Sequence, residues 1–276
     1  MCVSARPAEF KGTTLYASFE QHPKLGQIAV NGYQNTARNL DRGPNAMLLH
    51  FPSRELVGKS NLVNTESAPR ILEDMREALT PRSRGIMLSS PKRSSGGMAE
   101  VFDHDIYTIV STHAPHLIPY ALKMVPGHKR PTISSELLGF YEELFPDWAF
   151  LLCCFDNREA QKANPLLWWY RTDEERLFLP AIDSHTGYAP KKESVDVDHW
   201  VIFGTDLPQG VRVGYRDRIS PELEAFLPER VIGRRFNAML SNGDFVIENV
   251  LQATDTRSIS RQTIEDYESL RVGALK

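Results

Sequence analysis

Short apolar segments separated by polar turns run along most of the chain, and they constrain the fold more than any other feature of the sequence. Three of them follow MCVSA within the first residues: TTLYASF at 13–19, GQIAVNGY at 26–33 and NAMLLHF at 45–51. Their β-branched and aromatic residues are typical of strands. The connections between them are short, which favours an antiparallel meander with MCVSA as its first strand.

Helices and further strands are expected after this meander. A helix should follow the N-cap Ser67, and a second should cover 133–144, because their apolar residues recur on one helical face. Strands are expected at 105–111, 148–155 and 166–171, in RLFLPAID, DHWVIFGTD, GVRVGY and DFVIENVL, and a last helix from about Ser258. This order predicts an α+β fold with mainly antiparallel sheets layered with helices. No long linker divides the chain, so residues 1–276 are expected to form a single compact domain.

The segment 81–97, PRSRGIMLSSPKRSSGG, is expected to be a flexible loop, because Ser, Gly, Pro and basic residues dominate it. It offers little apolar surface to offset the entropy of ordering it. Trypsin should therefore cut the native protein first after one of its four bases, Arg82, Arg84, Lys92 or Arg93. Mass spectrometry of the first fragments checks this. An intact 81–97 with cleavage elsewhere would instead place Ile86–Leu88 in a buried strand.

Charge and cysteine content exclude several classes of protein. The net charge is −3 and acids alternate with bases, so neither a nucleic-acid nor a membrane partner is expected. No apolar run reaches the roughly 18 residues of a membrane span. Cys153 and Cys154 stand within the apolar run LLCCF and are expected to be core thiols in a cytoplasmic protein.

Cys2 is the first candidate for chemistry. Removal of Met1 would leave a thiol and a free α-amino group on one residue. A thiol is strongly nucleophilic at neutral pH, and an α-amine titrates near pH 8, so the amine can act as the base. Arg6 is close in sequence and would place positive charge near the thiolate.

On this start and the meander that follows it, the chain resembles the cysteine-type N-terminal nucleophile hydrolases. The resemblance implies an amidohydrolase or amidotransferase that cleaves a carbon–nitrogen amide bond in a small-molecule or peptide substrate, with no cofactor. It also implies a donor for the oxyanion, which an asparagine amide can provide. The candidates are Asn31, Asn35, Asn45 and Asn157. The sequence differs from the amidotransferases, which continue Cys-Gly-Ile, because Val3-Ser4-Ala5 follows Cys2 here.

Two alternatives stay open at this point. Clusters of Asp and His would suit a metal-dependent hydrolase. Their members are Asp103, His104, Asp183, His185, Asp198 and His199. The other alternative is a non-enzymatic binding or accessory protein, which makes few demands on single residues. The sequence gives no prediction of the oligomeric state.

Overall fold

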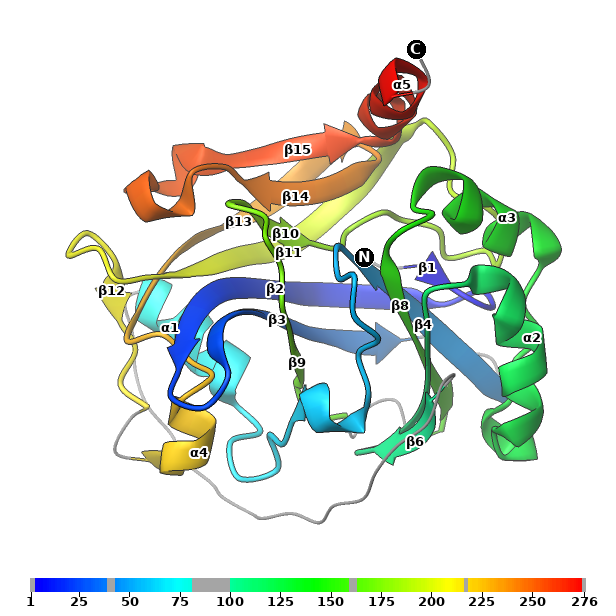
Figure 1. The fold of residues 1–276 in the computed structure, drawn as a ribbon, viewed down its shortest axis with the longest axis horizontal. Coiled ribbons are helices and arrows are strands. Elements are labelled where there is room, and N and C mark those ends of the chain that lie inside the picture. The colour runs from blue at the N-terminus through cyan, green and yellow to red at the C-terminus, as the bar shows by residue number, and fades with distance from the viewer. Residues whose placement is uncertain (1–2, 39–42, 81–99, 159–162, 216–217, 275–276) are drawn as a thin grey trace.

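Strands form most of the molecule, and helices pack around them (Figure 1). The computed structural model describes residues 3–38, 43–80, 100–158, 163–215 and 218–274. Within these residues the strands form three sheets, in which antiparallel neighbours predominate. The chain is therefore an α+β protein, as the sequence predicts.

The largest sheet has seven strands in the order β12-β13-β11-β2-β3-β9-β5. Its members are β2 (Glu9–His22), β3 (Gly26–Arg38), β5 (Leu62–Val63), β9 (Leu166–Tyr170), β11 (Ser194–Thr205), β12 (Val211–Arg212) and β13 (Arg230–Ser241). A tight turn joins β2 to β3, and Gly26 takes a positive φ of 75° there, which costs a glycine little. One pair in this sheet is parallel: β11 runs beside β2 in the same direction.

The second sheet has five strands, each antiparallel to its neighbours, in the order β1-β4-β8-β7-β6. These are β1 (Val3–Ser4), β4 (Pro44–Phe51), β6 (Glu100–His104), β7 (Tyr107–Thr112) and β8 (Ala149–Asp156). A third sheet, with the order β10-β14-β15, contains β10 (Leu177–Leu179), β14 (Gly243–Ile247) and β15 (Ile259–Thr263). In Figure 1, β14 and β15 lie above the largest sheet.

The helices lie at the outside of the sheets. They are α1 (Ile71–Leu79), α2 (Ile118–Ala121), α3 (Ser135–Leu144), α4 (Pro221–Glu224) and α5 (Ile264–Ala274). Figure 1 shows α2 and α3 beside the five-stranded sheet and α1 and α4 on the opposite side of the molecule. Ser134 caps α3, because its side chain accepts a hydrogen bond from the backbone N–H of Leu137. Within the described residues, no helix is long and apolar enough to cross a membrane.

The core joins the two larger sheets. All eight residues of β8 are buried, so the apolar run LLCCF is a core strand and Cys153 and Cys154 are buried free thiols, as predicted. Burial raises the pKa of Cys154. Between the sheets, the fully buried Trp168 of β9 packs against Phe51 of β4, with ring centroids 5.5 Å apart.

A buried polar network ties the third sheet to the five-stranded one. Asp244 of β14 lies 2.9 Å from His50 Nε2 of β4, and Tyr267 of α5 donates a hydrogen bond to the same carboxylate oxygen. Its other oxygen accepts the backbone N–H groups of Ala181 and Ile182. Burial alone would raise the pKa of Asp244, but His50 and the two N–H groups outweigh it and lower the pKa overall.

Three details differ from the sequence expectations. β3 and β4 belong to different sheets, so the first strands do not form one meander. Residues 230–241 form β13, which was not predicted. The segment after Ser258 begins as strand β15, and the last helix, α5, starts only at Ile264. The predicted loop 81–97 lies outside the described residues.

Candidate functional site

Three strands of the largest sheet end at the same edge, and acidic residues lie at this edge. β11 is parallel to β2, while β9 and β2 are each antiparallel to β3, so β2, β9 and β11 all run in one direction. Glu20 lies near the end of β2, the acidic stretch 173–175 follows β9, and Asp206 follows β11. The strand directions therefore bring together carboxylates that are far apart in the sequence.

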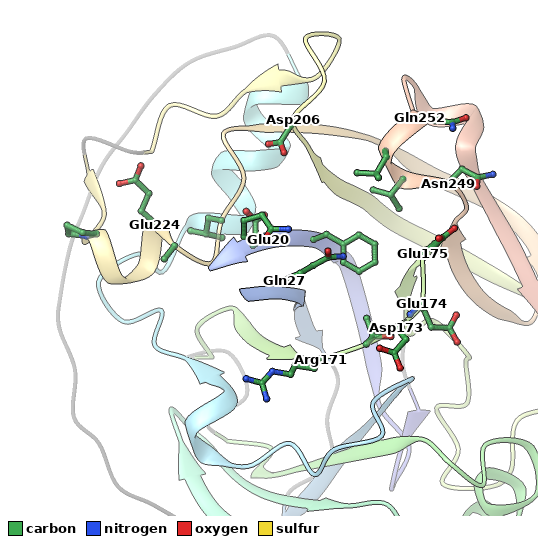
Figure 2. A pocket seen from close by; sticks show the side chains of 18 residues that line it. Glu20, Gln27, Arg171, Asp173, Glu174, Glu175, Asp206, Glu224, Asn249 and Gln252 are labelled. Atoms are coloured by element: carbon green, nitrogen blue, oxygen red, sulfur yellow. Dashed lines mark hydrogen bonds between the residues drawn. The ribbon is translucent and has the colours of Figure 1, made fainter. Parts of the chain in front are cut away.

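These residues line an open pocket with a volume of about 1150 Å³, here called the acidic pocket (Figure 2). Its acidic members are Glu20, Asp173, Glu174, Glu175, Asp206 and Glu224. Among the described residues that line it, Arg171 is the one basic residue. Figure 2 shows the labelled side chains entering from several separate elements around the opening. The lining is therefore strongly negative, although the whole chain is almost neutral.

The wall that carries Glu224 depends on a short capped helix. Ser220 accepts a hydrogen bond from the N–H of Leu223, and Pro221 occupies the first turn, where its missing N–H costs nothing. Leu227, just after α4, is buried and adds an apolar contact to the pocket. The pocket thus combines carboxylates with apolar surface from Phe19, Leu227 and Val250.

Some of the carboxylates are already paired within the protein. Glu174 accepts a hydrogen bond of 2.7 Å from Arg176 Nε. Burial lowers the pKa of Arg176, but Glu174 and then Glu248 outweigh it and raise the pKa overall. Asp173 lies 3.8 Å from the exposed Arg54, a weak contact. Glu175 and Asp206 form no ion pair within the described part of the chain, and both are exposed.

The segment 249–252, here called the ridge, lines the pocket on the side of the third sheet. Asn249 follows β14 in a left-handed conformation (φ 49°, ψ 51°) and starts the 3-10 helix η7 (Val250–Gln252). Asparagine is among the residues that adopt this conformation most readily. Val250 is buried beneath the ridge, and Leu251 projects outward with 85% of its surface exposed.

The residues predicted around Cys2 are brought together only in part. Cys2 lies outside the described residues, so its role stays a prediction. The backbone N–H of Arg6 donates to the side-chain oxygen of Asn45. The backbone N–H of Asn157 donates to the carbonyl of Gly43, which stands two residues before Asn45. Asn31 and Asn35 lie on β3 in the other large sheet. Their side-chain amides donate to the Phe178 carbonyl and the Tyr33 hydroxyl, which holds both in structural hydrogen bonds.

The predicted metal ligands are separated by the fold. Asp183 and His185 approach to 2.9 Å, an ion-pair distance without hydrogen-bond geometry. Asp198 pairs with Arg235 instead, and Thr108 donates to Asp103. His199, on β11 beside Asp198, is buried. His104 lies on another strand, β6, and its own burial lowers its pKa. No group of three or more His, Cys, Asp or Glu side chains in the described ranges could hold a metal ion.

Sequence reasoning missed the acidic pocket. A local signal was present, because the run TDEE follows the apolar segment LLWWYR directly. Glu20 and Asp206 also stand at the ends of apolar segments. These positions could be combined only with knowledge of the strand directions, which depend on the long-range pairing of β2 with β11.

The fold and the pocket define an α+β protein with an acidic cavity of ligand size. No family model matches the chain, and no curated protein gives a significant match. Among solved structures, the chain is similar to baculovirus P35, with 11% identity and a TM-score of 0.40 over 87% of this chain and 89% of that one. It is also similar to the structure of the caspase-8/P35 complex, with 11% identity and a TM-score of 0.38 over 87% of this chain and 88% of that one.

This comparison corrects one expectation. The description of the chain as a hydrolase of the N-terminal nucleophile group finds no support, since the solved structures found are of P35 and not of such hydrolases. The α+β fold class predicted alongside it holds.

Proposed function

We propose that the chain is a non-enzymatic binding protein whose acidic pocket receives a cationic group of its ligand. The observation that carries this proposal is the cavity of about 1150 Å³, whose described lining contains six carboxylates and one arginine. A concave site lined by charges of one sign concentrates ligands of the opposite sign.

The lining suits a basic side chain better than a simple cation. Carboxylates on several sides can accept the N–H groups of a guanidinium, which binds carboxylates with two parallel hydrogen bonds. The apolar surface of Phe19 and Leu227 can cover the methylene stem of the same side chain. Glu175 and Asp206 are the most available acceptors, because no cation of the described residues neutralises them.

An NMR titration at low salt with N-acetyl-arginine amide tests the proposal. We expect saturable shifts at residues of the acidic pocket, and much weaker binding of the citrulline counterpart, which has the same shape without the charge. Glu175→Gln and Asp206→Asn should each weaken binding about two- to five-fold, the usual effect of an exposed ion pair. Added salt should weaken it further.

Asp147→Asn is the matched control, because Asp147 is exposed and lies outside the pocket lining. It should leave the affinity unchanged. Equal binding of the arginine and citrulline compounds would contradict the proposal. Caspase-8, which is joined to P35 in a solved complex, is a useful folded probe in the same assay, and the pocket proposal does not depend on its result.

A further inference from the structure

A second hollow adjoins the acidic pocket. It has a volume of about 420 Å³, and we call it the serine hollow. Its lining consists of Glu248, Asn249, Gln252, Ala253, Arg257, Ser258 and Ser260. Asn249 and Gln252 line both cavities, so the two are neighbours across the ridge of η7.

The two hollows differ in chemistry. Six carboxylates dominate the acidic pocket, whereas the serine hollow offers two hydroxyls. Its two charged residues are each near an opposite charge: Arg257 pairs with Asp255, and Glu248 lies 3.8 Å from Arg176. Serine hydroxyls both donate and accept, as a peptide backbone requires of its partner. The serine hollow therefore suits neutral polar groups, while the acidic pocket suits a positive charge.

Leu251 stands on the ridge between them. Its side chain is 85% exposed, and the buried Val250 anchors the turn beneath it. An apolar group held outward at the boundary of two polar hollows gains free energy when a ligand that crosses the ridge covers it. Leu251 also lines the acidic pocket, so a small ligand there can touch it, whereas a ligand that crosses the ridge covers its outward face as well.

We propose that the ligand is an extended segment of a protein, with a basic side chain in the acidic pocket and its following backbone crossing Leu251 into the serine hollow. This inference rests on the proposed function and names the class of its ligand. The acidic pocket alone exceeds the roughly 300–1,000 Å³ typical of small-molecule sites. Charge complementarity selects a basic side chain for the acidic pocket, and the hydroxyls of the serine hollow accept the main chain next to it.

Two probes of equal charge test the inference. One is N-acetyl-arginine amide, and the other is a peptide in which the same arginine is extended on both sides by alanine and serine only. We expect the peptide to bind about tenfold more tightly, since it covers Leu251 as well. Leu251→Ser should remove most of this tenfold gain and weaken binding of the short compound much less, because Leu251 is only one of the residues that line the acidic pocket.

Leu270→Ser is the control, because Leu270 of α5 is also an exposed leucine and does not line either hollow. It should change neither affinity. If the short compound and the peptide bind equally and Leu251→Ser has no effect, the ligand is a small cation; the extended-segment inference is then wrong and the proposed function survives. If neither arginine probe binds, both fail.

Discussion

Replacing Asp244 with alanine should lower the free energy of unfolding by about 3–5 kcal/mol, the usual cost of removing one member of a buried pair. The substitution leaves His50 without its 2.9 Å contact and Tyr267 without its acceptor. It also leaves the N–H groups of Ala181 and Ile182 buried without a partner. Urea unfolding followed by circular dichroism measures the loss.

Asp255→Ala is the comparison for this variant. Asp255 also forms an ion pair, but its pair with Arg257 is exposed and solvent screens it. Its removal should change the midpoint of unfolding far less than Asp244→Ala. Similar losses for the two variants would show that the buried network does not hold the third sheet to the five-stranded one.

The same carboxylate makes the free energy of unfolding depend on pH in acid. The pKa of Asp244 is lower in the folded than in the unfolded chain, so the unfolded chain binds more protons in this range. Its contribution is complete above the unfolded pKa of about 4 and is lost as the pH falls through the lower, folded value. Asp244→Asn should therefore flatten the pH dependence of stability below about pH 4.

Trp168→Ala should cost about 3–5 kcal/mol of unfolding free energy, because it opens a cavity between the two larger sheets. Trp168→Phe should cost much less, about 1.5 kcal/mol at most. The indole Nε1 of Trp168 is buried and donates to no acceptor in the described part of the molecule. Phenylalanine removes that unpaired donor and keeps a ring against Phe51.

Its neighbour Trp169 supplies the control. Trp169 is half-buried, and its indole N–H donates to the carbonyl of Ser60 at 3.3 Å. Trp169→Ala should therefore cost less than Trp168→Ala, while Trp169→Phe loses a hydrogen bond that Trp168→Phe does not. A larger loss for Trp168→Phe than for Trp169→Phe, measured by urea unfolding, would contradict this account of the core.

Local sequence patterns predict the strands well where burial dominates. β2, β4 and β8 follow apolar runs that are recognisable without a structure. β13 was missed because its sequence, RVIGRRFNAMLS, contains a glycine and several arginines, and half of its residues are exposed. Its strand conformation comes from pairing with β11 along its whole length, which is a tertiary effect.

The candidate site was less predictable than the fold. Single carboxylates after strands are common, and only the directions of β2, β9 and β11 bring Glu20, Asp206 and the 173–175 stretch to one edge. The Asp and His residues chosen as metal ligands were close in sequence, but neighbouring residues of a strand such as Asp198 and His199 point to opposite faces. Proximity in sequence was therefore a poor guide to proximity in space.

The parallel pairing of β2 with β11 also sets the order in which the chain can fold during synthesis. Thr13–Ala17 align with His199–Phe203. The β2 edge of the β2–β3 hairpin therefore lacks this partner until β11 has been synthesised. At usual elongation rates this delay is on the order of ten seconds. An uncovered strand edge can pair with other chains during that time. Assembly of the largest sheet is thus a late event with high contact order, and a nascent chain that ends before β11 exposes β2 to aggregation and to chaperones.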